Sequence, residues 1–165
     1  MNKAKSMKIY KIAMLVCFIV IQIGCNNHKA EKKLISMAEA RKLAEKQFDA
    51  YLPQILKSHN AGLDISESYT GDFTGDGIED VAIFFTLVPR EGGNAIVGQG
   101  LTLYKNTGYE VKVIAGYDAK KLFSVDTICN GKIHIEEAEY AEGDGHCCPS
   151  IKTKRILRIS GNKAY

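Results

Sequence analysis

The first regularly patterned segment of the chain is amphipathic, with the period of a helix. Apolar residues recur at intervals of three and four, at Met37, Ala40, Ala44, Phe48, Tyr51 and Ile55. Charged residues separate them, which is typical of a helix with one buried face, and we expect it to cover a sheet. Ser36 and Glu39 have the spacing of a capping box, so the helix should begin there. Pro53 should kink or end it, because proline has no amide donor.

Beyond Gly62 the pattern changes to short runs that are typical of β-strands. Val81–Val88 is continuously apolar, which predicts a central strand buried on both faces. Two alternating runs, Leu101–Leu103 and Tyr109–Val113, flank a turn at 106–108. These runs predict neighbouring strands of a sheet.

The C-terminal part of the chain predicts three more strands. Phe123–Cys129 and Lys132–Tyr140 flank Asn130-Gly131, a strong signal for a hairpin with a type I′ turn. The second of these strands is rich in glutamate and the final one, Ile151–Ile159, is rich in lysine and arginine, so we expect them to pair antiparallel. The sequence therefore predicts an α+β fold, with an N-terminal helix packed on an antiparallel sheet of five or six strands, in a single domain at residues 36–165.

The N-terminal segment has the layout of a secretory signal. A positively charged start, with lysines at 3, 5, 8 and 11, precedes the apolar run Ile12–Ile23, which only Gln22 interrupts. The run is shorter than the roughly 20 residues that a membrane-spanning helix needs. Cleavage is therefore expected, and a permanent membrane helix is disfavoured.

The residues around Cys25 indicate how the exported protein is retained. Gly24 directly precedes Cys25, and a polar run from Asn26 to Lys33 follows. This arrangement resembles a bacterial lipobox. The resemblance implies a lipoprotein signal peptide at 1–24, a fatty-acylated Cys25, and a tether at 25–35 that holds the domain on a membrane of the bacterial cell envelope, outside the cytoplasm. The alternative is an ordinary signal peptide followed by a chance cysteine.

The same segment accounts for the positive charge of the whole chain. Residues 1–25 hold four of the 22 lysines and arginines and none of the 19 acidic residues, so without them the net charge changes from +3 to −1. A nucleic-acid partner then has no support from composition, and we expect none.

The most specific local chemistry lies between residues 72 and 80. Oxygen-bearing side chains alternate with other residues, and glycines allow the sharp turn that a loop needs to wrap a hard cation. The predicted calcium ligands are the side chains of Asp72, Thr74, Asp76 and Asp80 and the backbone carbonyl of Ile78.

The stretch from Gly71 to Ile83 resembles the aspartate-rich loop of FG-GAP and VCBS-type repeats, in which a calcium loop joins two antiparallel strands. The loop occurs once, and a propeller needs several blades. The resemblance therefore implies a calcium loop and not the family's whole fold or its adhesion activity. The alternative is a plain Gly-Asp-Gly turn whose acids are solvated.

The predicted mature domain has three further cysteines, Cys129, Cys147 and Cys148, which can form at most one disulfide. Cys129 lies beside the predicted hairpin turn, and the other two follow the far end of the next strand, which disfavours a bridge to Cys129. Free thiols, a labile vicinal Cys147–Cys148 bond, or a different strand arrangement remain open.

The segment Asp144–Ser150 reads Asp-Gly-His-Cys-Cys-Pro-Ser and precedes the basic final strand. Together with the aspartate-rich loop, this Cys-Cys-Pro-Ser turn resembles the C-terminal end of small bacterial envelope lipoproteins of unknown function, which implies no activity. A soft-metal site from His146, the two cysteines and His134 is disfavoured, because neighbouring residues rarely supply three ligands to one ion. A thiol nucleophile paired with His146 is disfavoured for a similar reason.

No complete catalytic constellation or phosphate-binding loop is evident in the sequence. Our first hypothesis is a membrane-anchored, calcium-stabilised domain that binds a protein or glycan partner. The second is an envelope thiol-dependent enzyme or redox protein that uses Cys147, Cys148 and His146. The third is an inhibitor of a hydrolase.

Overall fold

The computed structural model describes residues 33–165, so the predicted signal peptide and Cys25 lie outside the described residues. The described part contains one helix, α2 (Met37–His59), and nine strands. The strands are β1 (Ala61–Gly71), β2 (Asp80–Pro89), β3 (Gly98–Asn106), β4 (Val111–Asp118), β5 (Leu122–Cys129), β6 (Lys132–Glu139), β7 (Ile151–Leu157), β8 (Ile159–Ser160) and β9 (Lys163–Ala164).

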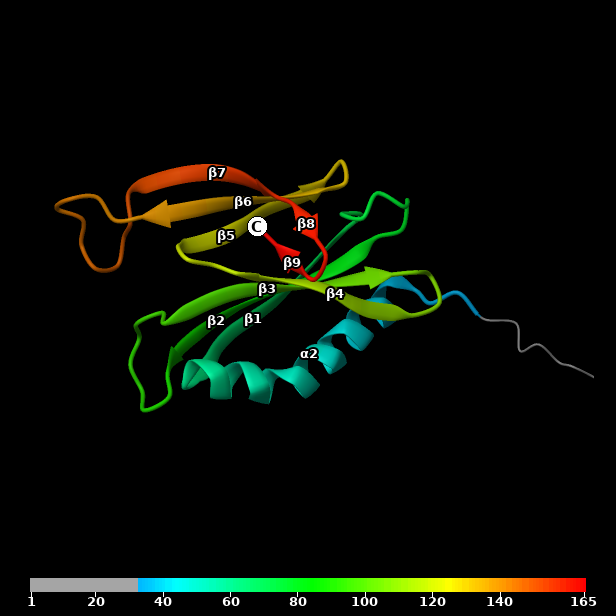
Figure 1. Ribbon diagram of the computed structural model, residues 1–165, viewed down its shortest axis with the longest axis horizontal. Helices are drawn as coiled ribbons and strands as arrows, with labels where there is room; N and C mark the ends of the chain where they lie inside the picture. Colours follow the sequence, from blue (N-terminus) through cyan, green and yellow to red (C-terminus); the bar gives the residue numbers. More distant parts are fainter. Residues whose placement is uncertain (1–32) are drawn as a thin grey trace, which may run out of the picture. The chain divides into compact units, whose positions relative to one another are not determined.

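The strands form two sheets, and with the helix they make three layers (Figure 1). The larger sheet has six strands in the order β1-β2-β3-β4-β9-β8, all antiparallel except for the parallel contact of β4 with β9. The smaller sheet has the order β5-β6-β7 and lies across the face opposite α2. The α+β fold with an N-terminal helix on a mostly antiparallel sheet of six strands is thus confirmed, and β5, β6 and β7 form a separate layer.

The start of α2 is the predicted capping box. Ser36 Oγ accepts a hydrogen bond from the Glu39 N–H at 3.2 Å, and the Ser36 N–H donates to Glu39 Oε2 at 2.8 Å. The preceding residue, Ile35, is the last of the predicted tether, and it already belongs to the domain: its N–H donates to the Gly108 carbonyl at 2.8 Å. The capping box therefore fixes the first turn of α2, and the bond from Ile35 to Gly108 ties this helix start to the turn between β3 and β4.

Pro53 does not end the helix, and Tyr51 does not lie on its buried face. Pro53 lies inside α2, which continues to His59, and Asn60 adopts the left-handed conformation as its C-cap. Tyr51 is 52% exposed and does not belong to the buried stripe. The stripe continues instead through Leu52 and Ile55, because Leu52 follows the buried Phe48 by four residues and so lies more nearly above it.

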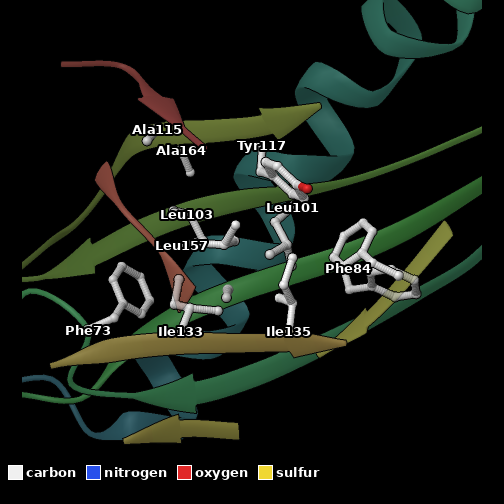
Figure 2. Close-up of a cluster of buried hydrophobic side chains, with 12 residues drawn as sticks. Phe73, Phe84, Leu101, Leu103, Ala115, Tyr117, Ile133, Ile135, Leu157 and Ala164 are labelled. Atoms are coloured by element: carbon white, nitrogen blue, oxygen red, sulfur yellow. The ribbon is translucent and has the colours of Figure 1, made fainter. Parts of the chain in front are cut away.

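Strand β2 explains the two-layered core, and its burial on both faces is confirmed. Val81, Ile83, Phe85 and Leu87 face the helix, whereas Ala82 and Phe84 pack toward the three-stranded sheet. This alternation follows from the period of two along a strand. Figure 2 shows the second cluster, in which Ile133, Ile135 and Leu157 of the smaller sheet meet Leu101 and Leu103 of β3.

The hairpin and the charged pairing in the smaller sheet are also confirmed. Asn130 and Gly131 both have positive φ, at 52° and 71°, and connect β5 to β6. Strands β6 and β7 pair antiparallel with Glu136 opposite Lys154. The Arg155 guanidinium lies 2.6 Å from a Glu137 carboxylate oxygen, so charge and register agree.

Candidate functional site: the aspartate loop and the cleft beside it

The first half of the aspartate loop is organised by Asp72. Its Oδ1 accepts hydrogen bonds from the N–H groups of Gly75 at 2.6 Å and Asp76 at 3.2 Å, and its Oδ2 accepts from the Gly77 N–H at 2.8 Å. Gly75 and Gly77 both have positive φ, which glycine adopts without steric cost. A carboxylate at this position therefore holds the turn by collecting backbone donors.

Asp76 is held by a lysine from a different strand. Its Oδ1 accepts from the Ile78 N–H at 3.0 Å, and its Oδ2 lies 2.7 Å from the ammonium group of Lys105 on β3. The hydrogen bond from Lys105 lowers the pKa of Asp76, and the same contact raises the pKa of Lys105. The ammonium group of Lys105 thus already occupies the Oδ2 side of the Asp76 carboxylate.

Asp80, the first residue of β2, is fully buried and joins three parts of the chain. Its Oδ2 accepts from the Thr74 N–H and its Oδ1 accepts from the Asn106 N–H, both at 3.0 Å. Burial raises the pKa of Asp80, and the two backbone donors act in the opposite direction. Asn106 adds a bond of its own from Nδ2 to the Glu79 carbonyl at 3.0 Å.

The carboxylates of Asp72, Asp76 and Asp80 are therefore close in sequence, but each accepts hydrogen bonds from backbone N–H groups. Within residues 33–165, no group of three or more His, Cys, Asp or Glu side chains has the arrangement that would hold a metal ion. One feature of the loop fits an oxygen-ligated cation: Thr74 Oγ1 is buried near the carboxylates of Asp76 and Asp80 and makes no well-aligned hydrogen bond. Calcium binding by Asp72, Thr74, Asp76, Ile78 and Asp80 stays a prediction.

The cysteines adopt one of the arrangements left open above. Cys147 and Cys148 form a vicinal disulfide, and Cys129 is an exposed free thiol. Adjacent Cα atoms are 3.8 Å apart, closer than in ordinary disulfides, so the bond should be readily reduced. The pair lies on an exposed loop between β6 and β7.

Asp144 organises that loop. Its Oδ2 accepts hydrogen bonds from the N–H groups of Ala141 at 2.7 Å and Ser150 at 2.8 Å, and from Ser150 Oγ at 3.0 Å. The backbone bond from Ala141 is the main reason that the pKa of Asp144 is lowered. Tyr140 Oη donates to the His146 carbonyl at 2.6 Å, so His146 is fixed through its backbone. The loop is thus closed by the hydrogen bonds of Asp144 and Tyr140, because the disulfide links only two consecutive residues.

A buried charged cluster between the two sheets was not expected from the sequence. Glu137 is 4% exposed and accepts from Arg155 at 2.6 Å and from Tyr117 Oη at 3.3 Å. Burial, and next the nearby Glu137 charge, raise the pKa of Tyr117. The opposite charges of β6 and β7 indicate that these two strands pair. No local pattern of the sequence shows that Tyr117 of β4 donates a hydrogen bond to Glu137 of β6.

A cleft of about 950 Å³ lies between the aspartate loop and strands β6 and β7 of the smaller sheet. Ile156 and Ile159 are 44% and 37% exposed and give the cleft its apolar surface. Phe73, Ile133 and Leu157 are buried beneath it, and Figure 2 shows these three side chains together at one end of the buried cluster. Thr74 also lines the cleft, so the aspartate loop forms part of its wall. A volume of this size is in the range of small-ligand sites.

The charged side chains that line the cleft are mainly cationic: Lys132, Lys154, Arg155 and Arg158, with His134 and a single acid, Asp126. Lys154 pairs with Asp126 at 3.4 Å, and Arg155 pairs with Glu137. Among the described residues, Lys132 and Arg158 make no ion pair. The cleft therefore combines an apolar surface with an excess of positive charge.

Comparison with protein-family models, with curated proteins and with solved structures finds no match to this chain. In the part of the chain from residue 33 onward, no helix is long and apolar enough to cross a bilayer.

Proposed function

We propose that this protein is a membrane-anchored bacterial envelope lipoprotein whose α+β domain binds an anionic, partly apolar ligand in the cleft between the aspartate loop and strands β6 and β7. The cleft carries the proposal, because its wall joins the exposed apolar Ile156 and Ile159 to the unpaired cations Lys132 and Arg158. An ionised ligand group can pair with these cations while an apolar portion leaves water. A segment of a partner protein has this chemistry.

The binding proposal is tested with naphthalenesulfonate, which carries one anionic group on an apolar ring. We expect saturable binding to the full-length protein in nanodiscs of phosphatidylcholine, measured by isothermal titration calorimetry against protein-free nanodiscs. Replacing Lys132→Glu together with Arg158→Glu should weaken binding by about tenfold, which corresponds to about 1.4 kcal/mol.

A matched control is Lys42→Glu with Lys46→Glu on the exposed side of α2, which changes the net charge by the same amount. It should leave the affinity unchanged. Equal loss in both double variants would show a general charge effect and would contradict a ligand site in the cleft.

The membrane anchor has a separate test. Cys25→Ser should prevent incorporation of radioactive fatty acid and should release the protein from the membrane fraction or leave it uncleaved, because acylation needs the cysteine sulfur. Equal labelling of wild type and variant would remove the lipoprotein proposal and would leave the ligand proposal intact.

Calcium bound at the aspartate loop belongs to the same proposal, as a stabiliser of the cleft wall. The ligands would be the carboxylates of Asp72, Asp76 and Asp80, Thr74 Oγ1 and the Ile78 carbonyl. Thr74 Oγ1 supports this assignment, because it is buried without a well-aligned hydrogen bond and yet lies close enough to Asp76 and Asp80 to lower the pKa of each.

The disulfide supports a second candidate function, that of a thiol-dependent envelope redox protein. A structural role predicts that a maleimide reagent labels Cys129 alone, both before and after treatment with a mild thiol reductant such as glutathione. Peptide mass spectrometry identifies the labelled residues. Labelling of Cys147 or Cys148 after the mild reductant would favour the redox function instead.

A further inference from the structure

The outer strand of the smaller sheet, β7, presents a free backbone edge. Among the described residues, β7 pairs with β6 alone, at the end of the order β5-β6-β7 (Figure 1). Six of its seven residues are exposed, and only Leu157 is buried. Unpaired N–H and C=O groups along such an edge are a template for another strand.

The two faces of β7 differ in chemistry. Leu157 belongs to the buried cluster, so the residues two and four before it, Arg155 and Thr153, lie on the inner face. Lys152 and Lys154 lie on the outer face, and Lys154 also lines the cleft. An added strand would therefore meet the two lysines on one face and Thr153 and Arg155 on the other.

The lysines of β7 are available to a partner. Lys152 and Lys154 have side chains that are 50% and 76% exposed, and their ion pairs with Glu136 and Asp126 span 4.0 and 3.4 Å. Exposed pairs of this kind contribute little to stability, so a partner's carboxylates can compete for the two lysines. Two copies of β7 would bring like charges together, which disfavours self-association at this edge.

Strand β6 shows which sequence chemistry suits β7. It places Glu136 opposite Lys154 and Glu137 beside Arg155, in an antiparallel register. Arg155 is held by Glu137, whereas Lys154 stays exposed to a strand on the other side of β7.

We infer that β7 is the docking strand for an extended acidic segment of a partner protein, which adds to the smaller sheet as a fourth strand. This inference rests on the proposed function, because an added strand would lie beside the part of β7 that lines the cleft, where its acidic residues would meet Lys152 and Lys154. Backbone hydrogen bonds give such strand addition its affinity, and alternate side chains give its specificity.

The test uses a fluorescent peptide as long as β7, in which glutamate alternates with valine, added to the full-length protein in phosphatidylcholine nanodiscs. Fluorescence anisotropy should show saturable binding. Lys152→Glu with Lys154→Glu should weaken it by about tenfold or more, whereas Lys42→Glu with Lys46→Glu should not change it. Cooperative thermal melting of both variants shows that they are folded.

Two N-methylated peptides separate strand addition from other binding. One is methylated at every glutamate N–H and the other at every valine N–H. An edge strand directs alternate N–H groups to its neighbour, so one of the two should lose binding and the other should keep it. Equal binding of both methylated peptides, or equal binding of a peptide with lysine in place of glutamate, would overturn strand addition. If naphthalenesulfonate binds and the acidic peptide does not, the inference fails and the proposed function stands. If neither binds, both fail.

Discussion

Replacing Asp80 with alanine is expected to lower the free energy of unfolding by about 2–4 kcal/mol. The carboxylate is fully buried and accepts the N–H groups of Thr74 and Asn106, each at 3.0 Å. Alanine would leave both donors without a partner, and an unsatisfied buried donor costs about 1–3 kcal/mol. Relief from burying the carboxylate offsets part of this loss. Denaturant unfolding followed by circular dichroism measures the difference.

Asp76→Ala is the matched control, since it removes a carboxylate from the same loop. The Asp76 side chain is 30% exposed and its main contact is an ion pair with Lys105, which is worth about 1 kcal/mol or less at a surface. If Asp80→Ala is no less stable than Asp76→Ala, the hydrogen bonds that Asp80 accepts from Thr74 and Asn106 do not stabilise the fold.

The contribution of Asp80 to the free energy of unfolding should become larger as pH falls. Burial raises its folded-state pKa, so its contribution to stability is full below the unfolded-state pKa and is lost as pH rises through the folded-state pKa. The difference in stability between wild type and Asp80→Ala should therefore widen as pH falls. Asp76 and Asp144 have lowered pKa values, and their contributions are lost as pH falls.

Calcium is expected to raise the free energy of unfolding of the wild type by about 2.7 kcal/mol when its concentration is a hundred times Kd. Magnesium should do less, because it demands a tighter octahedral shell than a flexible loop supplies. Asp76→Ala should abolish the gain with little loss of stability in chelator. Thermal unfolding with calcium, magnesium or chelator is the measurement. Bound calcium should also lower the pKa of Asp80, which carboxyl NMR titration detects.

Lys105 provides a sharper test of the ion. Its ammonium lies 2.7 Å from Asp76 Oδ2 and competes with a bound cation. Lys105→Met should therefore increase calcium affinity, whereas Lys42→Met on the exposed face of α2 should not. If melting does not differ between calcium and chelator in either the wild type or Lys105→Met, the aspartates are turn residues and Lys105 is their only cation.

Parts of the candidate site follow from local sequence. Asp72 can organise its turn because its carboxylate reaches donors three to five residues away, and glycines at 75 and 77 allow the backbone to pass around it. Adjacent thiols in Cys147 and Cys148 also limit the possible pairings. Lys105 and Asn106, by contrast, lie some 25 residues beyond Asp80, and only the pairing of β2 with β3 brings them to the loop.

The sequence by itself determined the fold class and the order of α2 and strands β2 to β7, because helix and strand periods, the capping box and the Asn-Gly turn are local properties of neighbouring residues. It also determined the pairing of β6 with β7, since opposite charges lie on consecutive strands. It did not predict β1, β8 or β9. Only the tertiary structure decided that the strands divide into two sheets, that Glu137 is buried against Tyr117, and that a cationic cleft opens beside Phe73. These features depend on how layers pack across long sequence separations, and the periodicity of a single strand shows which face is buried without showing what covers it.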